Sequence, residues 1–231
     1  MINLIRKLKY IIQGKYIIVN QIKKNKQWFG NSYGGFYVAN DSLCDNSIVY
    51  SIGIGEDVSF DLGVIEKYSC KIFAYDPTPK SVNWINKNVS NKNFNFSPLG
   101  ISNEKGSRLF YLPKDNKHVS GSLEKISTVN EEMAVELEFD TLKNQMIKNN
   151  HKKIDFLKMD IEGSEYDVIE SILNEKIEID QILVEFHPHL IQNGRKKTKN
   201  TIIKLESFGY KCFARSNTFL EYSFIKLKKD L

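Results

Sequence analysis

The chain has few cysteines, few arginines and no long apolar run, and each shortage excludes a class of protein. Its 231 residues include three cysteines, Cys44, Cys70 and Cys212, which lie far apart. Such an odd and sparse set fits neither a disulfide framework nor a zinc site, so we expect a cytoplasmic protein. No apolar run approaches the ~18–20 residues that a membrane-spanning helix needs.

The basic residues are mostly lysine. The net charge is +5, but only four of the 33 basic residues are arginines, and the lysines are scattered along the chain. Proteins that read nucleic acids depend on arginine for bidentate contacts with bases and phosphates, so this balance argues against a nucleic-acid partner. A length of 231 residues with 41% hydrophobic residues indicates one domain with an extension.

We assign residues 1–45 to the extension and residues 46–231 to the main domain. Residues 1–19 alternate apolar side chains with lysine and arginine, and they lack the small-residue cleavage site of a signal peptide. This pattern predicts a helix that packs on the domain, and a basic amphipathic helix in peripheral contact with a membrane is the alternative. The aromatic, glycine-bearing segment 28–38 completes the extension, either in packing or on the substrate side.

Strand and helix patterns alternate through the main domain. Apolar runs that end at turn residues predict strands at Ile48–Ile52, Lys71–Tyr75, Phe94–Leu99, Ser107–Leu112, Val135–Phe139, Ile154–Met159, Gln181–Phe186, Tyr210–Ala214 and Thr218–Lys226. Helical patterns cover Val58–Lys67, Pro79–Lys87, Thr141–Lys148, Ser164–Leu173 and Lys196–Phe208.

This alternation predicts an α/β fold with helices on both faces of a mainly parallel, seven-stranded sheet. The last two strands are separated by a short turn, so they must form an antiparallel hairpin. The strand Ser107–Leu112 is expected to pair with Leu99–Ser102. Thr78 and Ser164 stand where helix N-caps are expected.

The most informative motif is a glycine turn after the first core strand. The apolar run Ile48–Ile52 ends at Gly53 and Gly55, and Glu56 and Asp57 follow, where a helix can begin. Strand, glycine turn and helix form the entrance to a nucleotide pocket. A pyrophosphate would be repelled by two carboxylates at the helix N-terminus, whereas the ammonium of S-adenosylmethionine would be held there. The alternative is that the two acids only stabilise the first helical turn.

Other polar residues follow the ends of neighbouring strands, where ligands bind in open α/β sheets. Asp76 lies 21 residues after Gly55 and can accept the hydroxyls of a ribose, or else cap a turn. Asp160 and Glu162 can orient the methionine end of the cofactor, accept a substrate proton or bind a divalent cation, with local capping as the alternative. We assign no metal ligands from the sequence.

Two histidines are candidates for roles in the site. His187 follows a core strand and can act as a general base near neutral pH, although a structural histidine in a proline turn fits equally well. His118 lies in the polar segment 113–128, which can cover the pocket.

Taken together, the motifs resemble those of the FkbM-type S-adenosylmethionine-dependent methyltransferases. The matching blocks are G-I-G-E-D, A-Y-D-P-T-P, L-K-M-D-I-E-G-S-E and V-E-F-H, between Ser47 and His189. The resemblance implies a class I, Rossmann-like methyltransferase that acts on a hydroxyl oxygen of a sugar or other small molecule. It also implies a cofactor site formed by Gly53, Gly55, Glu56, Asp76, Leu99, Gly100, Asp160 and Glu162.

The expected reaction is an in-line displacement in which an acceptor hydroxyl attacks the methyl carbon opposite the sulfonium. Positioning supplies much of the acceleration, and a base helps because a sugar hydroxyl is a weak acid. His187 is the first candidate for that base and Asp160 the second. The alternatives are an RNA or protein methyltransferase, an NAD-dependent enzyme, or a non-catalytic binding or scaffold protein with the same fold.

Overall fold

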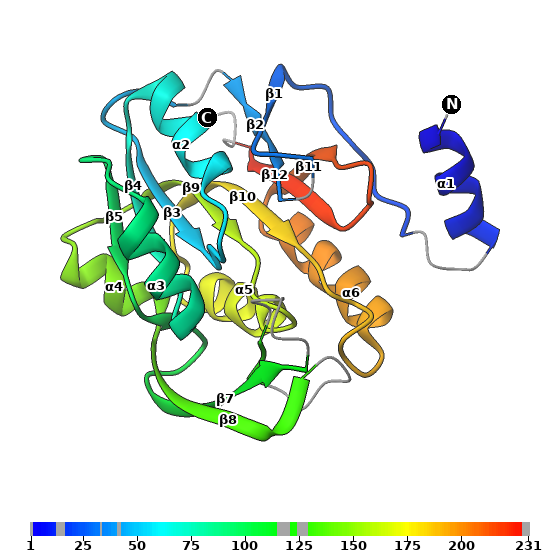
Figure 1. Cartoon of the computed structure of the whole chain (residues 1–231). Coiled ribbons are helices and arrows are strands. Elements are labelled where there is room, and N and C mark those ends of the chain that lie inside the picture. The colour runs from blue at the N-terminus through cyan, green and yellow to red at the C-terminus, as the bar shows by residue number, and fades with distance from the viewer. Residues whose placement is uncertain are drawn as a thin grey trace.

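The fold is built on one large sheet. The computed structural model describes residues 2–12, 17–32, 34–40, 43–114, 121–123 and 129–227. The strands of the large sheet are β3 (Ile48–Ile52), β4 (Lys71–Tyr75), β5 (Phe94–Ser97), β9 (Ile154–Met159), β10 (Ile179–Glu185), β11 (Tyr210–Arg215) and β12 (Glu221–Lys226). Their spatial order is β11-β12-β10-β9-β3-β4-β5 (Figure 1).

The strand directions confirm the predicted parallel sheet with a final hairpin. Strands β3, β4, β5, β9 and β10 run parallel to one another, whereas β12 runs antiparallel to both β10 and β11. From β3 the chain first builds outward through β4 and β5, and it later returns to add β9 on the other side of β3. The carboxyl ends of β3 and β9 therefore flank the point where the strand order reverses, which is where open α/β sheets bind ligands.

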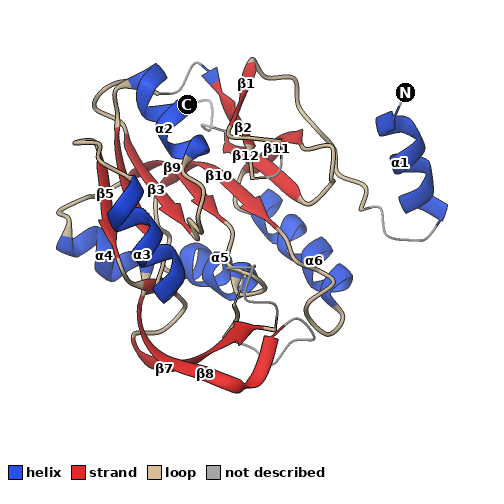
Figure 2. Cartoon of the chain, in the orientation of Figure 1, coloured by secondary structure: helices blue, strands red, loops and turns tan. Residues whose placement is uncertain are grey.

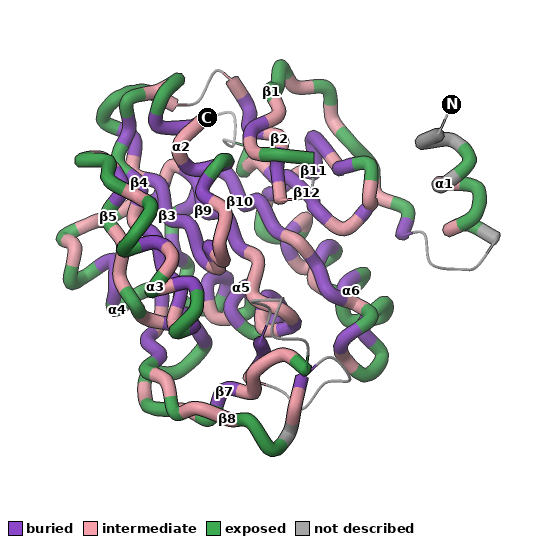
Figure 3. Tube along the Cα trace, in the orientation of Figure 1, coloured by how far each residue is buried: buried purple, intermediate pink, exposed green. Residues whose placement is uncertain are grey.

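Helices cover both faces of the sheet, as the alternating sequence predicts. They are α2 (Ser59–Tyr68), α3 (Pro79–Asn88), α4 (Leu142–Lys148), α5 (Glu165–Asn174) and α6 (Gly194–Ser207). Alternate residues along each strand face opposite sides. Val49 packs on the side of α2 and α3, and its neighbour Tyr50 packs on the side of α4, α5 and α6. The central strands are buried on both faces (Figure 3).

A second, smaller sheet lies beyond the large one. It consists of β6 (Gly100–Ile101), β7 (Gly106–Pro113) and β8 (Val129–Asp140), in the order β6-β8-β7. Strands β7 and β8 lie side by side at the bottom of Figure 2. The predicted pairing of 107–112 with 99–102 is wrong, because β8 lies between them and pairs with both. The third core strand also ends earlier than expected, at Ser97 instead of Leu99.

The N-terminal extension contains a helix and a hairpin. Helix α1 (Ile2–Ile12) is followed by β1 (Lys26–Phe29) and β2 (Phe36–Ala39), which pair antiparallel. The hairpin corresponds to the aromatic segment, for which no strands were predicted. Phe29 and Phe36 join the core beside α2, so packing of this segment is observed. The division at residue 45 stays a prediction.

The amphipathic helix α1 presents apolar side chains to solvent. Ile5 and Leu8 are 64% and 50% exposed, whereas the ring of Tyr10 lies 5.8 Å from that of Phe219. Packing of α1 on the domain and peripheral membrane contact both stay predictions. In the described ranges, no helix combines the length and the apolar character needed to cross a membrane.

Two predicted caps are not formed by side chains. Thr78 and Ser164 precede α3 and α5, but neither side chain caps its helix. Helix α2 begins at Ser59, three residues later than the earliest predicted start at Glu56. The carboxylate of Asp57 binds both the backbone N–H and the hydroxyl of Ser59, which fits its predicted role at the helix start.

Candidate functional site

A pocket opens at the carboxyl ends of β3, β4, β9 and β10 and collects nearly all the residues predicted from the sequence. Its lining includes Gly53, Gly55, Glu56, Asp76, Gly100, Asp160, Glu162 and His187. Leu99 is absent from the lining residues and packs instead against the hydrophobic core. The sequence therefore predicted the position of the pocket, and the structure leaves Leu99 outside it.

The glycine turn requires glycine for two reasons at Gly53. Its φ is +76°, a left-handed conformation that is costly for other residues. A Cβ atom would also lie 1.7 Å from the carbonyl oxygen of Asp160, so the ends of β3 and β9 could not approach each other. The chain thus brings the glycine turn and the acidic block of β9 into direct contact.

The carboxylate of Asp76 stabilises this turn. Its Oδ2 accepts hydrogen bonds from the backbone N–H groups of Ile54 and Gly55 at 3.0 and 2.8 Å. Its Oδ1 accepts bonds from the backbone N–H and the hydroxyl of Thr78. Asp76 is 5% exposed, and these four donors occupy the acceptor sites of both oxygens. A ribose hydroxyl would have to displace one of them.

Glu56 lies at the mouth of the same pocket. Its Oε2 forms an ion pair with Nζ of Lys80 at 3.1 Å, and both side chains are partly exposed. An exposed pair of this kind contributes little to stability, so the carboxylate can exchange partners at small cost. Glu56 lines the pocket, and its role as an ammonium ligand stays a prediction.

The small sheet provides an apolar wall opposite the glycine turn. Phe110 and Phe139 line the pocket, and Gly121 and Leu123 lie beside them in the lining. Ser122 donates a hydrogen bond to the carbonyl oxygen of Glu162 at 3.2 Å, which joins this wall to the acidic block. His118, in the segment predicted to cover the pocket, lies outside the described residues.

His187 is buried and its ring orientation is fixed by Glu165. The side chain is 5% exposed, and its Nδ1 lies 2.7 Å from Oε1 of the fully buried Glu165. Glu165 also accepts hydrogen bonds from the backbone N–H groups of Ile161 and Gly163. Burial alone lowers the pKa of His187, but the charge and hydrogen bond of Glu165 outweigh it and raise the pKa well above its usual value.

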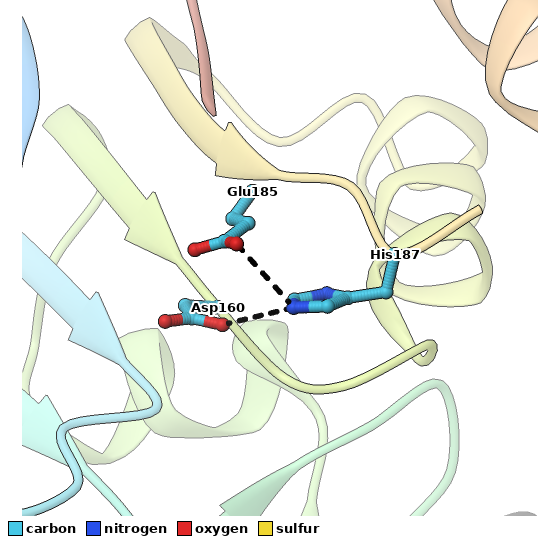
Figure 4. Close-up of side chains that lie close together, drawn as sticks. All are labelled: Asp160, Glu185 and His187. Atoms are coloured by element: carbon cyan, nitrogen blue, oxygen red, sulfur yellow. Dashed lines mark ion pairs between the residues drawn. The ribbon is translucent and has the colours of Figure 1, made fainter. Parts of the chain in front are cut away.

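The other ring nitrogen of His187 faces three carboxylates. Nε2 lies 3.7 Å from Oδ1 of Asp160, 3.6 Å from Oε2 of Glu162 and 3.7 Å from Oε1 of Glu185. Figure 4 shows Asp160 and Glu185 converging on this nitrogen from the ends of adjacent strands. Burial, with the nearby charge of Asp160, raises the pKa of Glu185 to about 9.

Glu162 has an unusual backbone conformation beside this group. Its φ is +51°, in the left-handed region, and Gly163 follows with φ +106°. A non-glycine residue in that region costs about 1–3 kcal/mol, and such residues cluster at functional sites. The strained turn directs the side chain of Glu162 toward His187.

A second buried polar group lies beneath the glycine turn. Ser51 and Lys158 are register partners on β3 and β9, and Nζ of Lys158 donates to the carbonyl oxygen of Gly53. Asp61 of α2 is 2% exposed, and its Oδ1 makes no hydrogen bond, like the hydroxyl of Ser51. Burial raises the pKa of Asp61 to about 6, against the attraction of Lys158.

Sequence reasoning missed three residues of the site: Glu165, Glu185 and Lys158. Glu185 had a signal, because it ends a buried strand two residues before His187. Glu165 looked like an ordinary acidic residue in the first turn of a helix, where such residues are common. Its burial follows from the position of α5 against the strand ends and not from any local pattern.

The fold and the site together define a class I, Rossmann-like methyltransferase. The seven-stranded, mainly parallel sheet with its antiparallel β12, and the pocket at the glycine turn beyond β3, are the features of that class. The model of the FkbM methyltransferase domain matches residues 39–212. The chain belongs to the FkbM methyltransferase family. No curated protein matches the chain in sequence.

Several solved structures are similar in fold at low sequence identity. An rRNA methylase from Streptococcus thermophilus is 13% identical with a TM-score of 0.44, over 81% of this chain and 91% of that one. The fibrillarin pre-rRNA processing protein of Methanococcus jannaschii is 11% identical with a TM-score of 0.47, over 93% and 99%. The N-terminal domain of human METTL16 in complex with SAH is 8% identical with a TM-score of 0.41, over 78% and 60%.

Proposed function

We propose that this methyltransferase transfers the methyl group of S-adenosylmethionine to a hydroxyl oxygen of a sugar, glycan or other small metabolite. The observation that carries the proposal is the charge of the pocket. Its lining holds the carboxylates of Glu56, Asp76, Asp160 and Glu162 around the glycine turn, with Lys158 and His187 as basic residues. Such a pocket favours a ligand with an ammonium and a sulfonium and repels the phosphates of a dinucleotide.

The residues present fit this methyl donor. The turn at Gly53 and Gly55 leaves space for a ligand against the main chain, as a nucleoside requires. The exposed carboxylate of Glu56 can exchange Lys80 for the ligand's ammonium. When bound, S-adenosylmethionine supplies an electrophilic methyl group. The protein then has to orient the acceptor oxygen, exclude water and accept a proton.

The acceptor side of the pocket is formed by the small sheet and the end of β10. Phe110 and Phe139 line the pocket together with Asp160 and His187, and their rings would exclude water from a bound acceptor. Both were predicted as candidates for the base. His187 stays the first candidate for the proton acceptor and Asp160 the second, because both lie at the strand ends that line the pocket.

Calorimetry with S-adenosylmethionine and S-adenosylhomocysteine tests the donor. We expect both to bind, and Glu56→Gln to weaken S-adenosylmethionine about 10- to 100-fold, the loss typical of a hydrogen bond to a charged group. Glu66→Gln on the exposed face of α2 is the matched control and should bind normally. Absence of binding to the wild-type protein would instead support a non-catalytic role.

The acceptor is tested by methyl transfer from radiolabelled donor to two sets of substrates. One set contains monosaccharides, glycans and small hydroxylated metabolites, and the other contains total RNA and protein. We expect label in the first set. Label confined to RNA or protein would overturn the proposed substrate class and leave methyl transfer standing.

A further inference from the structure

We propose that Asp160, Glu185 and His187 form a binding site for a divalent transition-metal ion, with Mn²⁺ as the best-fitting probe. From the sequence, a divalent cation was one of several alternatives for Asp160 and Glu162, and no metal ligand was assigned. The role of the bound ion in catalysis, which is to bind and orient the acceptor hydroxyl, rests on the proposed function. The binding site itself rests on geometry alone.

The distances suit a shared ion better than direct contacts. One ligand atom from each of the three residues lies within 4.8 Å of the other two, and Nε2 lies 3.7 Å from both carboxylate oxygens. These separations exceed hydrogen-bond distance. Ligand atoms held about 2.0–2.2 Å from one ion lie roughly 3–4 Å apart. The side chains in Figure 4 therefore need only a small contraction to share an ion.

The orientation of the buried His187 ring directs Nε2 toward the carboxylates of the group. His187 is 5% exposed, and its Nε2 points at carboxylates that are all 3.6 Å or more away. Its Nδ1 is held by Glu165 at 2.7 Å. A carboxylate on one ring nitrogen fixes the tautomer, so the other nitrogen presents its lone pair to a metal.

The carboxylates around His187 also favour a bound cation. Asp160, Glu162, Glu165 and Glu185 all place an oxygen within 3.7 Å of a ring nitrogen. Four carboxyl groups around one buried imidazole are costly to bury, and a divalent cation would offset the negative charge that they carry.

The donor set selects the kind of ion. Two carboxylates and one imidazole combine the oxygen ligands that suit Mn²⁺ with the nitrogen ligand that suits first-row transition metals. The strained turn places Glu162 as a further oxygen donor beside them. An ion held here faces the pocket, because all three proposed ligands line it.

The test is a titration of metal-free full-length protein with MnCl₂, followed by the electron paramagnetic resonance signal of free Mn²⁺. We expect one bound ion and a ¹⁴N coupling from an imidazole. Glu185→Gln and His187→Gln should weaken binding, and His187→Gln should remove the ¹⁴N coupling. Glu165→Gln should weaken binding about 10- to 100-fold, as for other residues that orient a ligand.

Glu66→Gln is the matched control, because Glu66 is an exposed acidic residue of α2 outside the pocket. It should keep the Mn²⁺ affinity of the wild-type protein. Lack of binding by the wild-type protein, binding without ¹⁴N coupling, or equal binding by all variants would overturn the site. The Mn²⁺ titration contains neither the methyl donor nor an acceptor, so it tests the metal site independently of the proposed function. Mn²⁺ binding by a protein that transfers no methyl group would overturn the proposed function and leave the metal site standing.

Discussion

The carboxylate of Asp76 accepts a hydrogen bond from the backbone N–H of Gly55 at 2.8 Å, so the second core strand holds the turn that ends the first. The two residues are separated by 21 positions, a spacing that the sequence analysis assigned to ribose binding. In the structure, the carboxylate is already occupied by backbone and hydroxyl donors. Asp76 therefore supports the pocket before any ligand arrives.

Replacement of Asp76 by Asn should lower stability even without ligand. The new amide keeps one oxygen but turns an NH₂ group toward backbone N–H donors, which leaves buried donors unpaired. We expect a loss of about 1–3 kcal/mol in the free energy of unfolding, measured by chemical denaturation. An unchanged free energy of unfolding with weaker donor binding would instead assign Asp76 to the ribose.

Replacement of Gly53 by Ala should separate the ends of β3 and β9. The new methyl group would overlap the carbonyl oxygen of Asp160, in a backbone conformation with φ +76° that alanine disfavours. We expect a loss of more than about 1–3 kcal/mol in the free energy of unfolding, together with loss of donor binding.

The control for this change is Gly63→Ala in helix α2. Its added Cβ would lie 3.4 Å from Cδ1 of Phe29, an ordinary contact, and alanine favours a helix over glycine. Stability should stay equal or rise by up to about 1 kcal/mol. Equal losses in the free energy of unfolding for Gly53→Ala and Gly63→Ala would show that the close contact at Gly53 is not the cause.

The buried Asp61 should make stability depend on pH. Its pKa is raised from 3.8 to about 6, so the folded protein favours the neutral carboxyl. This contribution is fully present below pH 3.8 and is lost as pH rises through 6, at a cost of about 3 kcal/mol. Asp61→Asn should remove that slope from the free energy of unfolding between pH 4 and 7.

Asp45→Asn provides the comparison, because Asp45 is exposed in a turn. Denaturation curves across that pH range should run parallel for the wild-type protein and Asp45→Asn, and diverge for Asp61→Asn. Parallel curves for all three proteins would show that Asp61 ionises in the folded state without penalty.

Replacement of His187 by Ala should lower turnover while donor affinity stays nearly intact. His187 faces the acceptor side, and loss of a group that assists proton transfer reduces rates about 10²- to 10⁴-fold. Methyl transfer and donor calorimetry are measured on the same preparation. His189→Ala, at an exposed histidine two residues on, should turn over normally. Unchanged turnover in His187→Ala would remove His187 from the chemistry.

Much of the large sheet could be predicted because its strands are short apolar runs with clear ends. The run Ile154–Met159 is such a strand, and its boundaries match β9. The pairing of the small sheet could not be predicted, because β6 has two residues and its partner β8 alternates charged and apolar side chains. Long-range register, and not local preference, decides which strand lies between the others.

The residues of the candidate site also fall into those that a local pattern predicts and those that depend on long-range packing. Gly53 and Asp160 stood at strand ends and were predicted, since the ends of parallel strands meet at one edge. The burial of Glu165 and the convergence of Glu185 on His187 depend on how α5 and β10 pack. The contact between Glu165 and His187 joins residues 22 positions apart, so no local pattern contains it.

The close contact between Gly53 and Asp160 has a consequence for engineering the enzyme. It fixes the donor side of the pocket through the large sheet, whereas Phe110 and Phe139 on the opposite wall belong to the small sheet. Under the proposed function, side chains on β7 and β8 can be exchanged for those of other family members to change the acceptor. The donor side would be retained, which makes the small sheet the natural unit for libraries of altered specificity.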